Sequence, residues 1–148
     1  MITQPKTNCS QCPRLYSFRL KNAKNYIDWH NAPVSSFGDT DGQLLIVGLA
    51  PGLRGANKTG RPFTGDWAGD LLYATLAKFG FTSGRYGATA EDGLKLLNCR
   101  ITNAVRCVPP ENKPTSEEIK TCNKFLIREL EGMRNLKVIL TLGGIAHS

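Results

Sequence analysis

The chain has 148 residues, enough for one domain with a single hydrophobic core, and its apolar fraction of 41% is ordinary for a globular protein. It contains neither the roughly 18 consecutive apolar residues of a membrane span nor the apolar core of a signal peptide, so we expect a cytoplasmic protein that contacts no membrane. Its formal net charge of +7 favours a polyanionic partner such as nucleic acid, although a basic surface without a specific partner gives the same value.

The first half of the chain predicts a buried strand followed by a long loop and a helix. Residues 43–49 are a short, continuous apolar run, which is typical of a strand buried on both faces. Residues 50–65 are rich in glycine and proline and therefore predict a loop. Asp66 is well placed to cap a helix that runs to about Phe79, and residues 82–93 follow as a polar connector.

The second half predicts two further strands with a helix between them. A strand is expected from about Leu96 to Val105, and Pro109-Pro110 ends it. The segment Thr115-Ser-Glu-Glu118 is typical of a capping box that opens a helix. Lys137 to Leu142 predict a third buried strand, after which Gly143-Gly144 turns the chain toward another helix.

This order of elements predicts an α/β fold, a single three-layer domain over residues 1–148 with a central parallel sheet. Ligands of such sheets bind beyond the carboxyl ends of the strands. The loop from Gly48 to Asp66, the residues around Asn103 and the Gly143-Gly144 turn all reach that edge, so we expect one site there. Because the sequence stops as a further helix begins, we also expect a domain that is incomplete at its C-terminus and lacks at least one strand.

Four of the five cysteines form a pattern typical of a metal centre. Cys9-Ser-Gln-Cys12 is a CxxC pair, and Cys107 and Cys122 could complete a four-sulfur site. Thiols of a cytosolic protein stay reduced, which favours metal chemistry over a disulfide. Zinc and an iron–sulfur cluster both accept four thiolates, and Cys122 could equally be a small core residue of its helix. Cys99 lies inside an apolar strand and is more typical of the core.

Two long blocks of the sequence resemble conserved motifs of one family, the iron–sulfur uracil-DNA glycosylases. The first motif is similar to Gly48-Leu-Ala-Pro-Gly52, Gly55-Ala-Asn-Lys-Thr-Gly-Arg-Pro-Phe-Thr-Gly-Asp66 and Gly69-Asp-Leu-Leu72. The second is similar to Ile101-Thr-Asn-Ala-Val-Arg-Cys-Val-Pro-Pro110. The resemblance spans nearly the whole chain and is closest to the type B, or family five, branch.

This resemblance implies a monofunctional glycosylase that hydrolyses the N-glycosidic bond of uracil in DNA for base-excision repair. It implies that DNA is the partner, and we expect the protein to act as a monomer. It also implies a [4Fe-4S] cluster, with zinc as the alternative, that acts as a structural staple rather than a redox centre. The cluster ligands would be Cys9, Cys12, Cys107 and Cys122, because these residues fall where the family has its ligands.

The resemblance further assigns roles to residues of the two motifs. Phe63 would stack on the extruded base and Asn103 would read its edge, although a loop phenylalanine can fill the core and an asparagine can satisfy a backbone group. Asp66 is the candidate catalytic residue, which would stabilise positive charge on the sugar and orient water, and the same residue can cap a helix. The base would also contact the backbone of the first motif, at Gly48, Leu49, Ala50, Pro51 and Gly52.

Two features depart from the broader family. Pro51-Gly52 stands where many uracil-DNA glycosylases have an acidic or amide residue, and the type B branch, usually with alanine at the position of Gly52, typically lacks it too. This supports the branch and predicts a roomier pocket that could admit hypoxanthine or xanthine. The later His-Pro-Ser-type motif has no counterpart before Ser148; His147 resembles a helix start in the family, and His30 has no site context.

Two other classes of function compete with this interpretation. One is a non-catalytic nucleic-acid-binding module held together by a cluster or by zinc, and the other is a structural α/β protein that binds a small phosphate ligand. A nucleoside-triphosphate-binding loop is disfavoured, because Asn57 stands where the Walker A pattern requires glycine before Lys58. Release of uracil separates the first rival from a glycosylase, and salt-dependent DNA binding separates the second.

Overall fold

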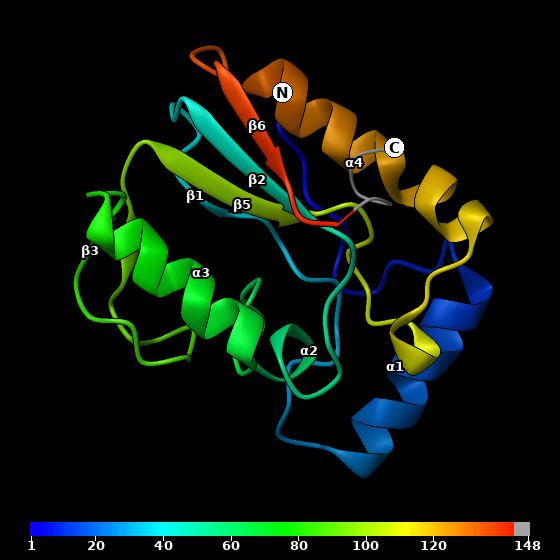
Figure 1. Ribbon diagram of the computed structural model, residues 1–148. Helices are drawn as coiled ribbons and strands as arrows, with labels where there is room; N and C mark the ends of the chain where they lie inside the picture. The colour runs from blue at the N-terminus through cyan, green and yellow to red at the C-terminus, as the bar shows by residue number, and fades with distance from the viewer. Residues whose placement is uncertain (144–148) are drawn as a thin grey trace.

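A four-stranded sheet forms the centre of the protein in the computed structural model, which describes residues 1–143 (Figure 1). The strand order is β1-β5-β2-β6. Parallel pairing joins β2 to both β5 and β6, whereas β1 pairs antiparallel with β5. The predicted central parallel sheet is therefore confirmed, with an antiparallel edge strand that the sequence did not indicate. The bounds of the strands are Phe37–Gly38 for β1, Leu44–Gly48 for β2, Cys99–Asn103 for β5 and Val138–Thr141 for β6.

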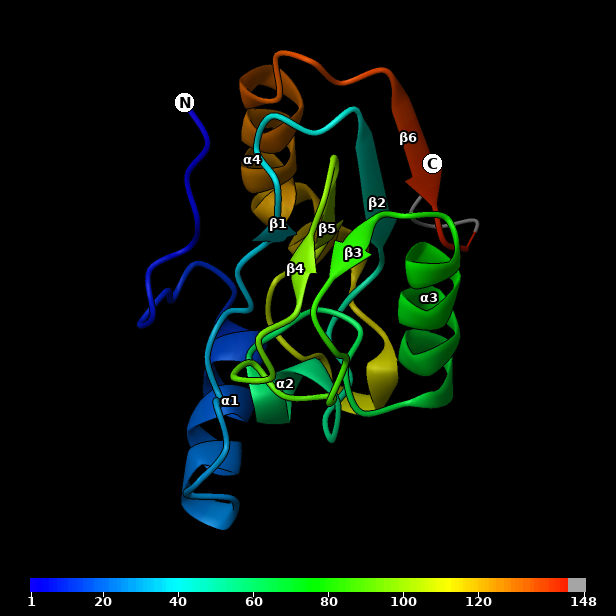
Figure 2. The same cartoon turned by 90° about the vertical axis from the view of Figure 1, so that its left-hand side faces the viewer.

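Helices cover both faces of the sheet, as Figure 2 shows edge-on: α3 (Trp67–Lys78) lies on one side and α4 (Ser116–Gly132) on the other. Successive side chains of β2 point to opposite faces, so Ile46 packs into the α3 layer while Leu45 and Val47 pack into the α4 layer. The α3 layer also contains Cys99, which is fully buried in the core as predicted. The three-layer architecture expected from the order of elements is thus confirmed.

A small second sheet replaces part of the strand predicted from Leu96 to Val105. The predicted segment divides into β4 (Lys95–Leu96) and β5, because Asn98 between them has a φ of 60° that no strand residue adopts. A hairpin forms between β4 and β3 (Thr82–Ser83), and Leu96 packs from it onto the α3 layer. The prediction of one continuous strand was therefore wrong.

Three elements unforeseen in the sequence lie at the end of the sheet toward which the parallel strands point (Figure 1). They are α1 (Pro13–Asn25), the single-turn α2 (Ala56–Thr59) and the 3₁₀ turn Pro110–Asn112. Of the side chains of α1 only Leu15, Arg19 and Asn22 are buried. Two of those three are polar, so the helix lacks the apolar stripe that would have announced it.

The capping residues predicted for the two long helices are confirmed. The side chain of Asp66 accepts from the Gly69 N–H at the start of α3, and Thr115 forms a complete capping box with Glu118 at the start of α4. No helix within residues 1–143 is long and apolar enough to span a membrane.

Candidate active site and cysteine pocket

The carboxyl ends of β2 and β5 bring the two sequence motifs side by side. The register of the two parallel strands sets Gly48 opposite Asn103. Pairing continues past the strand ends, because the Ala104 and Val105 N–H groups donate to the carbonyls of Gly48 and Leu49, each at 2.9 Å. Asn103 is thereby held against the start of the Gly48–Gly52 segment.

The ring of Phe63 and the amide of Asn103 both pack directly against Gly48, which leaves no space for a side chain at this position. A Cβ at position 48 would lie 2.3 Å from Cζ of Phe63 and 2.5 Å from Oδ1 of Asn103. Only a residue without a side chain lets both groups approach this closely. The glycine of the first motif is therefore what brings the candidate stacking ring and the candidate base-reading amide together.

A small pocket opens beside these residues, and Asn103 offers it an unused hydrogen-bond acceptor. Asn103 is 3% exposed, and its Oδ1 has no hydrogen-bond partner among residues 1–143. A buried polar atom without a partner is costly, and at a pocket wall it indicates a ligand group that would satisfy it. The residues lining the pocket are Ala50, Pro51, Gly52, Ala56, Phe63, Asp66 and Asn103. Leu49, also predicted to contact the base, lies instead on the open hollow outside, with Gly52 and Asp66 at the boundary between the two.

Asp66 caps α3 with one carboxylate oxygen, and among residues 1–143 its other carboxylate oxygen forms no hydrogen bond. Its Oδ1 accepts from the Gly69 N–H at 2.7 Å. Its Oδ2 faces the loop, about 4 Å from the positions that a Cβ would take at Gly52 and at Gly55. The side chain is exposed, so this second oxygen is accessible from the pocket.

The backbone around Phe63 is anchored by a buried ion pair that the sequence did not reveal. Phe63 has a φ of 58°, a strained conformation for a residue with a side chain. Two residues before it, Arg61 makes a bidentate pair with Asp92 at 2.7 and 2.8 Å, and both side chains are about 95% buried. The hydroxyl of Tyr73 donates to the Pro62 carbonyl at 2.6 Å. These contacts hold the Phe63 backbone in its strained geometry.

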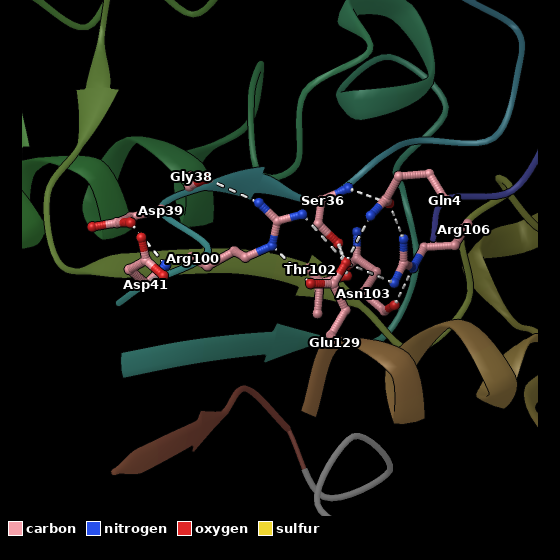
Figure 3. Close-up of polar contacts among 10 residues, drawn as sticks. All are labelled: Gln4, Ser36, Gly38, Asp39, Asp41, Arg100, Thr102, Asn103, Arg106 and Glu129. Atoms are coloured by element: carbon pink, nitrogen blue, oxygen red, sulfur yellow. Dashed lines mark hydrogen bonds and ion pairs between the residues drawn. The ribbon is translucent and has the colours of Figure 1, made fainter. Parts of the chain in front are cut away.

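A second buried network holds the opposite wall (Figure 3). Arg106 donates from Nε to the Asn103 carbonyl at 3.0 Å and from Nη1 to Gln4 Oε1 at 2.6 Å. Its Nη2 lies 3.6 Å from Glu129 of α4, a fully buried carboxylate that also accepts from Arg100 at 2.7 Å. The network connects the N-terminal segment, β5 and α4, and it fixes the turn that follows Asn103.

The four cysteines predicted as metal ligands line one small, largely apolar pocket between α1, α4 and the segment after β5. Burial raises the pKa of the Cys107 thiol and raises that of Cys122 to about 11. Burial and the neighbouring Cys107 raise the pKa of Cys12. Within residues 1–143 no three His, Cys, Asp or Glu side chains form a group arranged to hold a metal ion. The structure thus brings Cys9, Cys12, Cys107 and Cys122 to one place without showing a metal site.

A buried arginine, unnoticed in the sequence, points into the cysteine pocket. Arg19 of α1 donates from Nη1 to the Sγ of Cys107 at 3.2 Å. Its guanidinium offsets part of the effect of burial on the pKa of that thiol, because a nearby positive charge favours the thiolate. The donor set of four thiols and one adjacent cation fits a centre held by thiolates, which carries negative charge.

Of the two histidines, His30 lies within the described residues, and it does not line the pocket that holds Phe63, Asp66 and Asn103. His30 packs on Gly60 and lines a different hollow, with its Nε2 at 3.0 Å from the Pro33 carbonyl. His147, Gly144 and Ser148 lie outside the described residues. Sequence reasoning also missed Arg19, Arg61, Asp92, Arg106 and Glu129, whose partners are too distant along the chain for any local pattern to reveal them.

Known proteins that resemble this chain are uracil-DNA glycosylases. The type-5 uracil-DNA glycosylases of Pyrobaculum aerophilum and Thermus thermophilus are 39% and 41% identical to it over 143 and 150 residues. These alignments cover 94% and 98% of this chain but 63% and 68% of the two relatives. The type-4 uracil-DNA glycosylase of Archaeoglobus fulgidus is 37% identical over 114 residues, which are 76% of this chain and 49% of that protein.

The sequence identity and the covered share of this chain are both higher for these two type-5 relatives than for the type-4 enzyme of Archaeoglobus fulgidus, in agreement with the predicted branch. The chain spans about two thirds of the length of those two proteins and 54% of the type-5 enzyme of Mycobacterium bovis. A family model described as the uracil DNA glycosylase superfamily matches residues 35–148, which include both motifs and both walls of the pocket. The chain belongs to the uracil DNA glycosylase superfamily.

Proposed function

We propose that this protein binds an extruded uracil in DNA and hydrolyses its N-glycosidic bond, as a monofunctional glycosylase of base-excision repair. The observation that carries the proposal is the convergence of Phe63, Asn103 and Asp66 on one pocket at the carboxyl ends of β2 and β5. A ring, a carboxamide and a carboxylate are the groups that stacking on a base, reading its edge and stabilising charge require. The relatives named for this activity support the same proposal.

Base recognition in this proposal depends on the amide of Asn103. Uracil presents an N–H at position 3 beside the carbonyl at position 4, so a carboxamide can accept from the first and donate to the second. The unpartnered Oδ1 of Asn103 would then gain the hydrogen bond that it lacks. Phe63 would cover one face of the ring, because aromatic side chains stack on any base.

Bond cleavage depends on Asp66. When the bond between C1′ and the base breaks, the electron pair leaves with the base and positive charge develops on the sugar. A water oxygen then adds to C1′, and the proton that this water loses ends on the released base. Because Oδ1 of Asp66 caps α3, Oδ2 is our candidate to hold that water and to stabilise the sugar cation. Donation from the Asn103 amide would stabilise the negative charge that collects on the leaving base.

Deaminated purines belong to the same proposal as further substrates. Hypoxanthine presents an N–H beside a carbonyl, the pattern that uracil presents to Asn103. A Cβ built at Gly52 would meet no atom closer than 3.9 Å, so the pocket wall at this position is open. Excision of hypoxanthine, and by the same pattern xanthine, would follow from this space.

A [4Fe-4S] cluster bound by Cys9, Cys12, Cys107 and Cys122 is the cofactor that we propose. Four thiols lining one pocket, with the Arg19 guanidinium donating to Cys107, are a donor set that suits the negatively charged cluster. Such a centre would supply a cross-link between the N-terminal segment and the segment that follows β5. Asn103 ends β5 and Arg106 lies on the segment that follows it, so the cross-link would stiffen the wall that reads the base.

Substitution of Asp66 by asparagine tests the proposed chemistry while preserving the helix cap. Asparagine caps helices as well as aspartate does, so Asp66→Asn removes the charge without removing the cap. We expect uracil release in single-turnover assays to slow by about 100-fold or more, the magnitude seen when one stabilising group is removed, with DNA affinity nearly unchanged. The control Asp70→Asn makes the same charge change one turn later in α3. Equal rates for Asp66→Asn and the parent protein would refute the catalytic role.

The cofactor is tested by the colour and metal content of anaerobically purified protein. A cysteine-ligated iron–sulfur centre absorbs broadly near about 400 nm, and we expect this absorption together with iron and sulfide. Cys122→Ala should abolish the absorption, whereas Cys99→Ala, which alters a buried cysteine outside the pocket, should retain it. One zinc per colourless protein would favour the zinc alternative instead.

Three further properties belong to the proposal. A cytoplasmic location suits thiols that stay reduced, DNA is the partner, and the protein acts as a monomer. A non-catalytic nucleic-acid-binding module remains the alternative function. It predicts DNA binding without release of uracil or hypoxanthine under single-turnover conditions.

A further inference from the structure

Two stacked aromatic rings, with two cationic side chains next to them, lie beside the candidate pocket. The rings of Tyr26 and Trp29 are parallel, with centroids 3.9 Å apart and an interplanar angle of 4°. The guanidinium carbon of Arg54 lies 5.6 and 5.7 Å from the two ring centroids. The Lys58 Nζ lies 5.6 Å from the Trp29 centroid. We name these four residues the cationic platform.

Backbone hydrogen bonds fix the cationic platform to the first motif. The N–H groups of His30 and Asn31 donate to the carbonyls of Lys58 and Asn57, each at 3.0 Å. The Asn31 side chain donates in turn to the Tyr26 carbonyl at 2.8 Å. The segment with the two rings is therefore tied to α2, which lies in the same loop as Arg54 and Phe63. The rings hold Arg54 in a set position rather than leaving it a freely moving surface cation.

The charge of Arg54 is available to a ligand. Its side chain is exposed, and in the described part of the chain it forms no ion pair with a carboxylate. Its guanidinium carbon is almost equally far from the two ring centroids and therefore lies at the edge of the stack, so the rings do not cover all of its N–H donors. Lys58 is less available, because Asp28 and Glu91 line the hollow beside it.

The position of Arg54 connects the cationic platform to the candidate active site. Arg54 lines the open hollow that also includes Gly52 and Asp66, two residues of the base pocket. A nucleotide whose base enters that pocket carries its two phosphates to the rim. At this rim lies Arg54, which has no carboxylate partner among residues 1–143.

We infer that Arg54 binds a backbone phosphate of the DNA strand next to the extruded nucleotide, and that Tyr26 and Trp29 are positioning residues for it. The inference rests on the proposed function for its choice of ligand. Arginine matches phosphate with paired N–H donors, and such contacts fix the register of a protein on DNA without reading sequence. Arg54 would thereby help to align the target nucleotide with the pocket.

Salt-dependent binding to duplex DNA that lacks uracil tests the contact separately from catalysis. Each phosphate contact contributes about 0.9 to the slope of log K against log salt, so Arg54→Gln should reduce this slope by about that amount and weaken binding several-fold. Arg134→Gln is the matched control, because it removes the charge of another exposed arginine, one that follows α4. Equal slopes for Arg54→Gln and Arg134→Gln would overturn the inference.

Trp29→Leu tests the positioning role at constant net charge. Loss of the ring should weaken DNA binding although no charge is removed, and Arg54→Gln added to it should weaken binding little further. Full, additive effects of the two substitutions would overturn the positioning role. A greater loss of affinity for single-stranded than for duplex DNA would overturn it as well, because the rings would then be stacking on bases.

Failure of the proposed phosphate contact can be distinguished from failure of the proposed function. If the parent protein releases uracil but Arg54→Gln retains the parental salt slope, the phosphate contact fails and the glycosylase proposal stands. If no base is released but the slope falls by about 0.9, the phosphate contact stands and the glycosylase proposal fails.

Discussion

Two buried ion-pair clusters lie on opposite sides of the central sheet, and each supports one wall of the candidate pocket. On the α3 side, Arg61 and Asp92 form a closed one-to-one pair beneath Phe63. On the α4 side, the single carboxylate of Glu129 serves two arginines, one of which holds the carbonyl of Asn103. Buried arginine–carboxylate pairs support both walls, but the two walls differ in which other groups could stabilise the arginines if the carboxylate were lost.

The difference lies in what remains when the carboxylate is lost. Arg61 lies within 6 Å of three aromatic ring centroids, which would still stabilise its charge without Asp92. Arg100 and Arg106 are buried and share Glu129, so both would lose their partner at once. The Asn103 wall has less to replace its carboxylate, because Arg106 lies 6.0 Å from the single ring of Phe125, whereas Arg61 has three nearer rings.

Glu129→Gln should produce the largest loss of stability. Removing one partner of a buried ion pair costs about 3–5 kcal/mol, and here two guanidiniums are left without a carboxylate. The free energy of unfolding in urea measures this loss. The control Glu131→Gln changes an exposed residue two positions later and should stay within about 0.5 kcal/mol of the parent protein. Similar midpoints for the two variants would contradict the dependence of this wall on Glu129.

Gly48→Ala should have the next largest effect, because the two walls meet at this residue. The added methyl group would collide with Phe63 and Asn103, and displacement of either by about 1 Å can cost about 100-fold in rate. Single-turnover release of uracil measures the loss. Gly52→Ala adds the same methyl group where the nearest protein atom is 3.9 Å away, so it should not displace Phe63 or Asn103, and its loss of rate should be much smaller than that of Gly48→Ala. Equal loss in both variants would show that the space at Gly48 is not what matters.

Asp92→Asn should cost less than Glu129→Gln and affect only the Phe63 wall. The expected loss of stability is about 2 kcal/mol, the order of one hydrogen bond between charged groups. If the proposed function holds, uracil release should slow because Phe63 loses its support, while the iron of the proposed cluster should be retained. Glu91→Gln, the exposed neighbour, serves as the control. A loss of iron in Asp92→Asn would argue against two separately supported walls.

The difference between near and distant interactions explains what the sequence could predict. The strand around Ile46 and the caps at Asp66 and Thr115 follow from local patterns, and the structure has them. A strand also forms at Val138–Thr141, but the prediction that it is buried was wrong: Val138, Ile139 and Leu140 are 57%, 49% and 45% exposed, because β6 is the edge strand of the sheet among the described residues. The β4–β5 break was missed because nothing local to Asn98 shows its positive φ. Phe79, which follows Leu72 and Leu76 at helical spacing, is 67% exposed, because only tertiary packing decides which face of a helix is covered.

The same limit applies to the candidate site. Glycine-rich and strand-end signals were sufficient to bring the Gly48–Gly52 segment and Asn103 to one edge of the sheet. The supports were invisible, because Arg61 lies 31 residues from Asp92 and Arg100 lies 29 residues from Glu129. Glu129 is a charged residue at a fully buried position of α4, whereas its apolar neighbour Leu130 is exposed. Only the assembled fold shows why a carboxylate belongs there.

Acid should weaken both walls gradually, and this is the smallest effect that we expect. The hydrogen bonds from Arg61 lower the pKa of Asp92; burial alone would raise the pKa of Glu129, but its bonds from Arg100, Ser36 and Gln4 outweigh burial and lower it. A carboxyl whose pKa is lower in the folded state stabilises the fold above its ordinary pKa, near 4, and loses that contribution as the pH falls toward the folded value.

The free energy of unfolding should therefore be insensitive to these two groups near neutral pH and should fall below about pH 4, by at most about 1.4 kcal/mol per pH unit for each carboxyl. Asp92→Asn removes one of the two titrating groups, so its stability should decline less steeply with acid than that of the parent protein. Urea unfolding at a series of pH values from about 7 to about 3 measures both slopes. A parental slope in Asp92→Asn would mean that Arg61 does not hold this carboxylate in the folded protein, and the Phe63 wall would then need another support.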